Sequence, residues 1–296
     1  MNLNFYLKLA KKELFTLCRS LTGEGNLQTL KKLKKYEKKL VIKKFTSGKK
    51  VFDWKIPKEW VIKKAEVSDK FGNKIINFKD NNLKVIGYSQ PKKKIINKDE
   101  LLKKIFTLPN QPNAIPYITS YYKKRWGFCT THNDKKLIQK RYKKNDKFKI
   151  CIESKFKKGK LVYGECLIKG KSNQEILIST YICHPSMAND NLSGIIVAMS
   201  LISHFKKIKD LKKTIRFIFI PETIGSIAYI NENLSELKSK VIGGYNLSCI
   251  GDDRVHSMIL SKYGNSTSDK SLLEVYKKFN IKPKIYSFLK RGSDER

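Results

Sequence analysis

The stretch from Glu175 to Ser203 constrains the fold of this chain more than any other part of the sequence. It begins with a run of β-favouring residues, breaks at His184, and resumes with apolar residues at helical spacing over 193–207. A second apolar run follows at 214–220. Strand, helix and strand form a βαβ unit, in which the two strands lie parallel in one sheet. The sequence therefore predicts an α/β fold.

The turn after the first of these strands carries a histidine and an aspartate, His184 and Asp190. Open α/β sheets bind their ligands at the carboxyl ends of the strands, where this turn lies. An imidazole and a carboxylate on one loop can bind the same cation, and an aspartate can bridge two metals. In an alternative interpretation, residues 189–191 only cap the helix that follows, and His184 only ends the strand. We interpret the turn as a metal or substrate site.

Glu222 is the second candidate, because it follows the strand at 214–220 directly after a proline. Parallel neighbours bring their carboxyl ends to the same edge of a sheet, so we expect Glu222 to lie near His184 and Asp190. A carboxylate at this place can accept a proton from an activated water and return it to a leaving amine. The alternative is a surface glutamate that opens the next helix at its positive end.

The cysteines form no CxxC pair and occur largely within apolar runs: Cys18, Cys129, Cys151, Cys166, Cys183 and Cys249. We interpret them as buried free thiols in a reducing compartment. Cys183 precedes His184, which raises the question of a Cys–His nucleophilic site. Successive residues of a strand point to opposite faces, however. The sequence therefore disfavours a thiol mechanism that uses Cys183 and His184.

The basic composition suggests a nucleic-acid partner at first sight. The chain has 63 Lys and Arg against 26 Asp and Glu, which gives a formal net charge of +37. Basic residues that bind nucleic acid gather along one face or stripe. Here arginine is scarce and lysine is spread through every segment, which is typical of a compositional bias. We predict a solvated basic surface and no nucleic-acid partner.

Length and hydropathy indicate a folded protein without a membrane span. A chain of 296 residues with 40% hydrophobic content can bury a sizeable core. It contains no apolar run of roughly eighteen residues, the length that a membrane helix needs. The N-terminal stretch is too rich in lysine for the core of a signal peptide. We therefore expect a cytoplasmic protein with no membrane partner, and the oligomeric state stays open.

Changes of pattern along the chain predict three parts. Residues 1–50 carry the N-terminal helices, at 3–20 and 27–36. Residues 51–140 alternate short strands with Pro, Gly and Asn, which indicates a small antiparallel, β-rich subdomain inserted into or laid beside the main fold. Residues 141–296 carry the βαβ unit and form the α/β core.

A hairpin is predicted at the start of the α/β core. Residues 148–153 and 161–168 have strand-like patterns, and a Lys-Lys-Gly-Lys turn at 157–160 separates them. The second strand of this hairpin leads into the strand at 175–183.

An aromatic and basic cluster, Tyr121, Tyr122, Arg125 and Trp126, lies towards the end of the β-rich subdomain. One interpretation is an ordinary aromatic core patch. In the other, the subdomain overhangs the site and Arg125 binds a substrate carboxylate, because a guanidinium can hold a carboxylate through two parallel hydrogen bonds.

Several separated motifs occur in a recognisable order along nearly the whole chain. Besides the His184–Gly194 turn, they are Phe52-Asp53-Trp54, Pro57-Lys58-Glu59-Trp60, Ser120-Tyr121-Tyr122, Trp126-Gly127-Phe128-Cys129, Pro221-Glu222-Thr223-Ile224-Gly225-Ser226 and Arg291-Gly292-Ser293-Asp294-Glu295-Arg296. The turn resembles the metal-binding turn of zinc aminopeptidases of the bacterial leucyl aminopeptidase type. The whole set resembles the aminopeptidase-like proteins of uncharacterised function that are often encoded beside polysaccharide-biosynthesis genes.

The resemblance implies a zinc-aminopeptidase-like fold, with a mostly parallel sheet flanked by helices. It implies that His184 and Asp190 hold zinc and that Glu222 serves as general base and general acid. The substrate would be a peptide or a small amide-containing molecule. The loop at the C-terminal end would contact this substrate through Ser293, Asp294 and Glu295.

The chain also departs from the pattern of those aminopeptidases. They carry two adjacent glutamates, whereas Glu222 is followed by Thr223. Where they have an aspartate after a later strand, this chain offers Ser248 or Cys249, with Asp252 and Asp253 just beyond as further candidates. The resembling proteins also continue past residue 296 and draw a further histidine ligand from there, so the resemblance implies a C-terminally incomplete core. These differences favour one metal over two, or a weakened site.

We conclude from the sequence that a metal-dependent hydrolase of amide bonds, which activates water on zinc, is the leading hypothesis for the function. The competing hypothesis is a non-catalytic binding module that retains the aminopeptidase fold with an incomplete metal site. The resemblance links either one to surface-polysaccharide biosynthesis.

Overall fold

The computed structural model describes residues 2–290 and 292. The chain forms two compact units, which we describe one at a time. The first unit combines Met1–Ile56 with Lys160–Arg296, and the second is Pro57–Gly159. The β-rich subdomain was expected at 51–140. The second unit extends further because strand β9 (Lys147–Lys157) pairs with strands of that unit.

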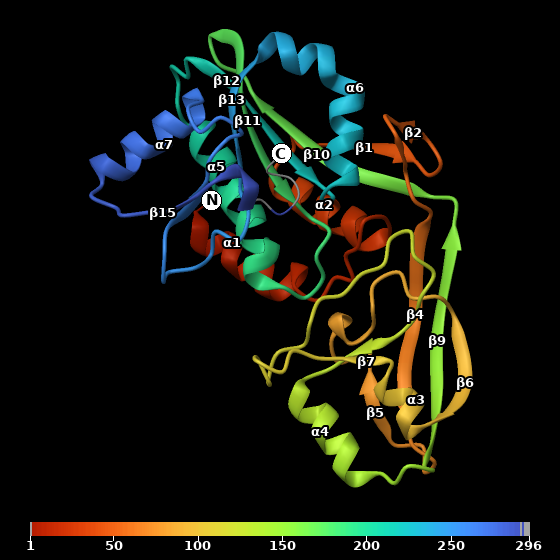
Figure 1. The fold of residues 1–296 in the computed structure, drawn as a ribbon. Coiled ribbons are helices and arrows are strands. Elements are labelled where there is room, and N and C mark those ends of the chain that lie inside the picture. Colours follow the sequence, from red (N-terminus) through yellow and green to blue (C-terminus); the bar gives the residue numbers. More distant parts are fainter. Residues whose placement is uncertain (1, 291, 293–296) are drawn as a thin grey trace. The chain divides into compact units, whose positions relative to one another are not determined.

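A five-stranded mixed sheet forms the centre of the first unit (Figure 1). Its strands, in spatial order, are β1 (Val41–Thr46), β10 (Lys160–Ile168), β12 (Lys213–Ile220), β11 (Ser172–Tyr181) and β13 (Val241–Asn246). The β12–β11 and β11–β13 pairs are parallel, whereas β1–β10 and β10–β12 are antiparallel. The expectation of a mostly parallel sheet is therefore wrong. The parallel βαβ part is present, and an antiparallel half is added at the β10 side.

Helices cover both faces of this sheet. They are α1 (Leu3–Leu9), α2 (Glu24–Tyr36), α5 (Ser193–Phe205), α6 (Ile224–Lys240) and α7 (Thr267–Lys278), with the short helical segments η1 (Ala10–Leu14), η3 (Ala188–Leu192) and η4 (Phe288–Lys290). Two small strand pairs complete the unit: β2 (Lys50–Val51) with β3 (Trp54–Lys55), and β14 (Ser257–Ile259) with β15 (Lys284–Tyr286).

The main core lies on the face of the sheet that α1, α2 and α5 cover. Alternate residues of β12 face opposite sides of the sheet, so Phe217 and Phe219 both point into this core. They are fully buried together with Leu30 of α2 and with Ile195 and Met199 of α5. Burial of these side chains, at roughly 1.5–3 kcal/mol each, fixes α5 against the sheet and thereby places the loop that precedes α5.

A buried ionic network lies on the opposite face of the sheet, under α6. Arg216 of β12 is 3% exposed, and its guanidinium donates to Glu175 Oε2 at 2.6 Å and to Glu165 Oε1 at 2.5 Å. It also lies within hydrogen-bonding distance of Tyr229 and Glu236 of α6. The guanidinium and the two buried carboxylates satisfy one another's donors and acceptors, so none of these charges is buried without a partner.

The second unit is built on an antiparallel four-stranded sheet (Figure 1). Its strands, in spatial order, are β5 (Lys74–Asn77), β4 (Glu59–Ser68), β9 and β6 (Lys92–Asn97). The remaining elements are β7 (Ile105–Phe106), β8 (Phe128–Cys129), α3 (Lys98–Leu102), α4 (His132–Arg141) and the short η2 (Asn82–Lys84).

The predicted hairpin at 148–168 is wrong. Strand β9 pairs with β4 and β6 in the sheet of the second unit, and β10 pairs with β1 and β12 in the sheet of the first. The two strands are consecutive and strand-like, but each takes partners that lie far away in the sequence. The segment between them, Lys158–Gly159, therefore connects the second unit to the first.

Candidate metal centre

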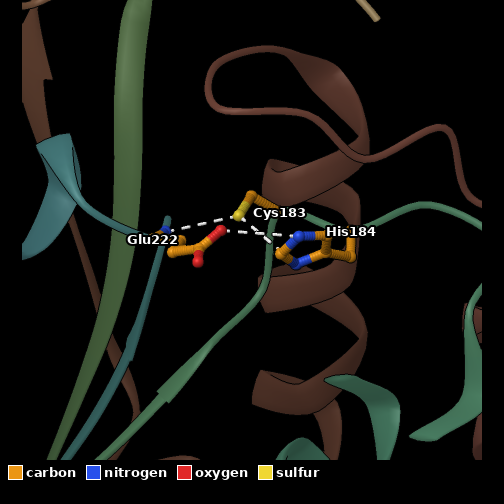
Figure 2. A group of neighbouring side chains, drawn as sticks. All are labelled: Cys183, His184 and Glu222. Atoms are coloured by element: carbon orange, nitrogen blue, oxygen red, sulfur yellow. Dashed lines mark hydrogen bonds and ion pairs between the residues drawn. The ribbon is translucent and has the colours of Figure 1, made fainter. Parts of the chain in front are cut away.

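The edge of the central sheet where the parallel strands end brings His184 and Glu222 together (Figure 2). Tyr181, the last residue of β11, is in register with Ile220, the last residue of β12. His184 and Glu222 follow these two strand ends within a few residues, and His184 Nε2 lies 3.4 Å from Glu222 Oε2. Parallel pairing thus produces the proximity that the sequence analysis expected.

Asp190 lies on the other side of the imidazole. Its Oδ1 is 3.7 Å from His184 Nδ1, so the two predicted metal ligands are close enough to share one cation. The Tyr181 hydroxyl donates a hydrogen bond of 2.5 Å to the same Oδ1 and lies 3.0 Å from Ser248 Oγ. The Tyr181 ring also packs edge-on against the imidazole, with 4.9 Å between the ring centroids. Tyr181 therefore orients both predicted ligands, and sequence reasoning missed it.

The alternative interpretation proposed that residues 189–191 cap helix α5. The asparagines beside Asp190 do not cap it. The N-cap of α5 is Leu192, which makes no side-chain capping bond. Instead, Asn191 Nδ2 donates to Leu247 O and its Oδ1 accepts from the Cys249 amide, while Asn189 Oδ1 accepts from the Gly251 amide. The two side chains hold the Asp190 loop against the segment that follows β13.

The start of α5 must be a glycine for this loop to pack. A Cβ atom at Gly194 would come within 2.3 Å of Leu247 O and of Thr180 Oγ1. We expect Gly194→Ala to lower the free energy of unfolding by about 1–3 kcal/mol, the usual cost of overpacking. Urea unfolding measures this change. Ser200→Ala, on the same helix at a half-buried position, is the control, and an equal effect of both substitutions would contradict the packing argument.

Cys183 also lies beside His184, although strand alternation led the sequence analysis to place the two side chains on opposite faces. Its Sγ lies 3.8 Å from His184 Nδ1 and accepts a hydrogen bond of 3.3 Å from the Glu222 amide (Figure 2). The alternation rule does not apply here, because β11 ends at Tyr181 and the chain leaves the strand geometry before Cys183. Cys183, His184 and Glu222 each offer a ligand atom, and the three atoms lie within 4.8 Å of one another.

Burial is the main reason that the imidazole of His184 is neutral. His184 is 6% exposed, and burial lowers the pKa of this histidine, while the negative charges of Asp190 and Glu222 act in the opposite direction and the net shift is downward. Arg19, itself 1% exposed, adds to the lowering. Its Nε donates to His184 O at 2.8 Å. A neutral imidazole has a free lone pair for a metal ion.

The positions at which the resemblance expects further ligands are occupied differently. Thr223 follows Glu222 and has a positive φ of 60°, so the chain turns sharply there into α6. Ser248 and Cys249 both face the Tyr181 hydroxyl, at 3.0 Å and 3.8 Å. Asp252 forms an ion pair of 2.6 Å with Arg254, which is largely exposed. The carboxylate of Asp252 is thus paired with a guanidinium at the surface.

Two comparisons of sequence establish the family. The family model described as "Domain of unknown function (DUF4910)" matches residues 8–296. The chain belongs to this family. A protein from Clostridium acetobutylicum with the provisional name "polysaccharide biosynthesis protein with aminopeptidase-like domain" is 41% identical over 285 residues, which cover 96% of this chain. The chain spans 64% of the length of that relative.

Two solved structures resemble this chain, one at high and one at low sequence identity. The crystal structure of a provisionally named peptidase from Clostridium acetobutylicum superposes with a TM-score of 0.92 at 39% identity and covers 99% of this chain and 68% of the other. A zinc aminopeptidase from Bacillus subtilis superposes with a TM-score of 0.66 at 12% identity, covering 96% and 78%. The DUF4910 chain therefore has an α/β fold like that of zinc aminopeptidases, with mixed sheets and flanking helices.

The remaining predicted site residues are placed as follows. Arg125 belongs to the second unit, where its Nη2 donates to Thr119 O at 2.7 Å. Ser293, Asp294 and Glu295 lie outside the described residues. In the part of the DUF4910 chain that the structure describes, no helix has the length and apolarity to cross a bilayer.

The side chains at the sheet edge suit zinc. Thiolate, imidazole and carboxylate are the three ligand types that zinc takes in proteins. Cys183, His184, Asp190 and Glu222 supply all of them at one edge of the sheet. His184 and Cys183 are buried, whereas the side chains of Asp190 and Glu222 keep 33% and 21% exposure. A metal ion at this place would be held from inside and remain open to substrate from outside.

Proposed function

We propose that this DUF4910 chain carries the site of a zinc-dependent amide hydrolase of the aminopeptidase-like type. The observation that carries the proposal is the convergence of His184, Asp190 and Glu222 at the carboxyl edge of parallel strands, with 3.7 Å and 3.4 Å between the imidazole and the two carboxylates. The fold supports it, since zinc aminopeptidases share this architecture. The name of the Clostridium acetobutylicum relative supports it as well.

In this proposal His184 and Asp190 hold the metal. Bound zinc supplies a Lewis acid that acidifies water and polarises the amide carbonyl. Tyr181 keeps the Asp190 carboxylate in place through its hydrogen bond, because hydrogen bonds to a ligand carboxylate orient it and strengthen metal binding. The low pKa of His184 keeps its imidazole unprotonated near neutral pH.

Glu222 moves the proton. Its carboxylate is partly exposed at the mouth of the site and lies beside the imidazole, so it can accept a proton from the attacking water. The same group then donates this proton to the leaving amine. The substrate we propose is a peptide or a small amide-containing molecule, and the relative's name suggests one connected with polysaccharide biosynthesis.

Metal content tests the proposal directly. We expect the purified chain to bind about one equivalent of zinc, and His184→Ala to weaken zinc affinity at least tenfold, since loss of supporting residues alone costs about 10–100-fold. Calorimetric zinc titration measures both values. His204→Ala, which changes a histidine on helix α5 away from the sheet edge, is the matched control. Equal zinc affinity in the His184 and His204 variants would contradict the proposal.

A binding module without catalysis is the second candidate, favoured by Thr223 and Ser248 at positions where the resembling enzymes have acidic residues. It predicts a chain that takes up no zinc at micromolar concentrations and binds amide-containing ligands without cleaving them. The same titration therefore separates the two candidates.

A further inference from the structure

A cavity of about 600 Å³ lies in the second unit, at the place where strand β6 begins. Its lining consists of Val61, Lys63 and residues 91–93 and 152–155, and we call it the lysine cavity. Ligand pockets in proteins usually have volumes of roughly 300–1,000 Å³. The lysine cavity therefore has the size of a small-molecule site, and none of its residues belongs to the candidate metal centre.

Strand β9 has a free edge along the lysine cavity. Strands β4, β9 and β6 lie side by side (Figure 1), but β6 begins at Lys92, which pairs with Ile152, whereas β4 continues beside β9 as far as Lys157. Within the described part of the chain, residues 153–157 therefore have a strand partner on the β4 side only. Unpaired backbone N–H and C=O groups of an edge strand are available to a ligand.

Three lysines of the lining lack an acidic partner. Lys63 comes from β4, Lys155 from β9 and Lys92 from the start of β6. Among the residues that the structure describes, none of the three forms an ion pair, although Lys64 and Lys157 of the same sheet pair with glutamates. The flexible four-carbon stem of a lysine can turn its ammonium group into a neighbouring space. Three uncompensated positive charges thus border one cavity.

An aromatic ring holds one of these lysines in place. The Nζ atom of the half-buried Lys92 lies 5.9 Å from the centroid of the Trp126 ring, and a cation over the face of a tryptophan is attracted by the ring electrons. Lys104 Nζ lies 5.1 Å from the same centroid. Trp126 belongs to the aromatic and basic cluster found in the sequence, and its contact with Lys92 gives that cluster a role at the lysine cavity.

The rest of the lining is mainly apolar, with a single carboxylate. Val61 and Pro91 offer apolar surface to a ligand. Glu153 is the one acidic residue of the lining, and its Oε1 lies 3.7 Å from Nζ of Lys93, the fourth lysine. Glu153 therefore offsets Lys93 and leaves the charges of the other three lysines uncompensated.

We propose that the lysine cavity binds a small organic phosphate. A phosphate monoester carries about −1.5 to −2 charges at neutral pH and has three acceptor oxygens, so it matches three ammonium groups better than a carboxylate does. Lysine binds phosphate as a point charge. The phosphate group meets Lys63, Lys92 and Lys155, and the organic part lies against Val61 and Pro91.

Titration of the whole chain with phenyl phosphate, followed by backbone amide resonances, tests the proposal. The probe combines a phosphate group with an apolar ring, and inorganic phosphate and phenol are its two halves. We expect shifts concentrated at residues 61–63, 91–93 and 152–155. Phenyl phosphate should bind more tightly than inorganic phosphate because the ring adds apolar contact, and phenol should cause no shifts there.

Three variants separate this site from general attraction to a basic protein. Lys63→Gln combined with Lys155→Gln should weaken phenyl phosphate binding roughly tenfold, since each charged contact contributes to the attraction. Lys136→Gln combined with Lys140→Gln removes the same charge from an exposed face of helix α4 and should leave the affinity within about twofold. Glu153→Gln should strengthen binding about threefold, because it removes the one negative charge of the lining.

The expected gain in Glu153→Gln has the opposite sign to the loss that a damaged fold would cause. Equal weakening by the two lysine pairs, or shifts scattered over the lysine-rich surface, would reduce the binding to general attraction and overturn the proposal. Weaker or unchanged binding in Glu153→Gln would also contradict it, and so would an unsubstituted chain that does not bind phenyl phosphate. None of these results depends on zinc, so the proposed function is tested separately.

Discussion

Glu222→Gln is expected to reduce amide hydrolysis by about 10²–10⁴-fold, the usual contribution of a general acid–base residue, while zinc affinity changes little. Glutamine has the shape of glutamate and can still contact His184 Nε2, but it cannot accept a proton. Because the proposal gives Glu222 the proton transfer and gives the metal to His184 and Asp190, its replacement should leave zinc bound. Turnover of leucine p-nitroanilide and a parallel zinc titration measure the two effects.

The control for this variant is Glu274→Gln, an exposed glutamate on helix α7, which should keep full turnover. If Glu222→Gln loses zinc and activity together, Glu222 is a ligand and the division of roles between the two carboxylates is mistaken. Full turnover in Glu222→Gln would remove this residue from the mechanism.

Arg216→Met should lower the free energy of unfolding by about 3–5 kcal/mol, because removal of one partner from a buried ion pair leaves uncompensated charge. Glu165 and Glu175 are 5% and 4% exposed, and both depend on the guanidinium. Lys43 also contacts Glu165 and compensates part of the charge of that carboxylate. Denaturant unfolding followed by circular dichroism measures the loss. Lys171→Met removes an exposed ion pair with Asp210 and should change stability by less than about 1 kcal/mol.

Acid should reduce the difference between Arg216→Met and the unsubstituted chain. Burial raises the pKa of Glu165, but hydrogen bonds from Lys43 and Tyr229 and the charges of Lys43 and Arg216 lower it, and the net shift is downward. A depressed folded-state pKa contributes stability that is present above the unfolded value and is lost as pH falls through the folded one. In the variant, Glu165 loses its buried cationic partner, so its protonation removes a charge that the variant buries with less compensation. The two stabilities should therefore converge below about pH 4.5, and a constant gap down to pH 3 would contradict this account.

Parallel pairing of β11 with β12 could be predicted from the sequence because two apolar strands on either side of a helix have one common solution. Parallel pairing then puts the carboxyl ends of both strands at the same edge of the sheet. From this rule alone His184 and Glu222 had to be near each other, and they are. The fold family was also predictable, because its motifs are distributed over nearly the whole chain.

The partner of a strand, in contrast, is not encoded in its own pattern. Residues 148–153 and 161–168 look like a hairpin locally, since both are strand-like and a glycine-containing turn lies between them. The pairs that form instead join β9 to β4 and β10 to β12. These long-range pairs bury faces that local periodicity cannot assign to a particular neighbour.

The side-chain positions of Cys183 and of the two asparagines could not be predicted for a related reason. The alternation rule holds only while the backbone stays extended, and the strand ends two residues before Cys183. Asn191 has its partners 56 and 58 residues away, at Leu247 and Cys249. An N-cap explanation considers only the neighbouring turn, whereas these side chains are held by another loop. A search of the sequence around a strand end for thiols as well as imidazoles and carboxylates would have found Cys183.

The bonds between the Asp190 loop and the segment after β13 determine when this site can form during protein synthesis. Asn189 and Gly251 are 62 residues apart, and the ribosome makes the chain from its N-terminus. The proposed ligands His184 and Asp190 therefore emerge well before the backbone groups that hold the Asp190 loop in shape. A nascent chain that ends before Leu247 has the ligands without their geometry. The loop geometry on which the proposed metal site depends is thus reached late in translation, once the segment through Gly251 has been made.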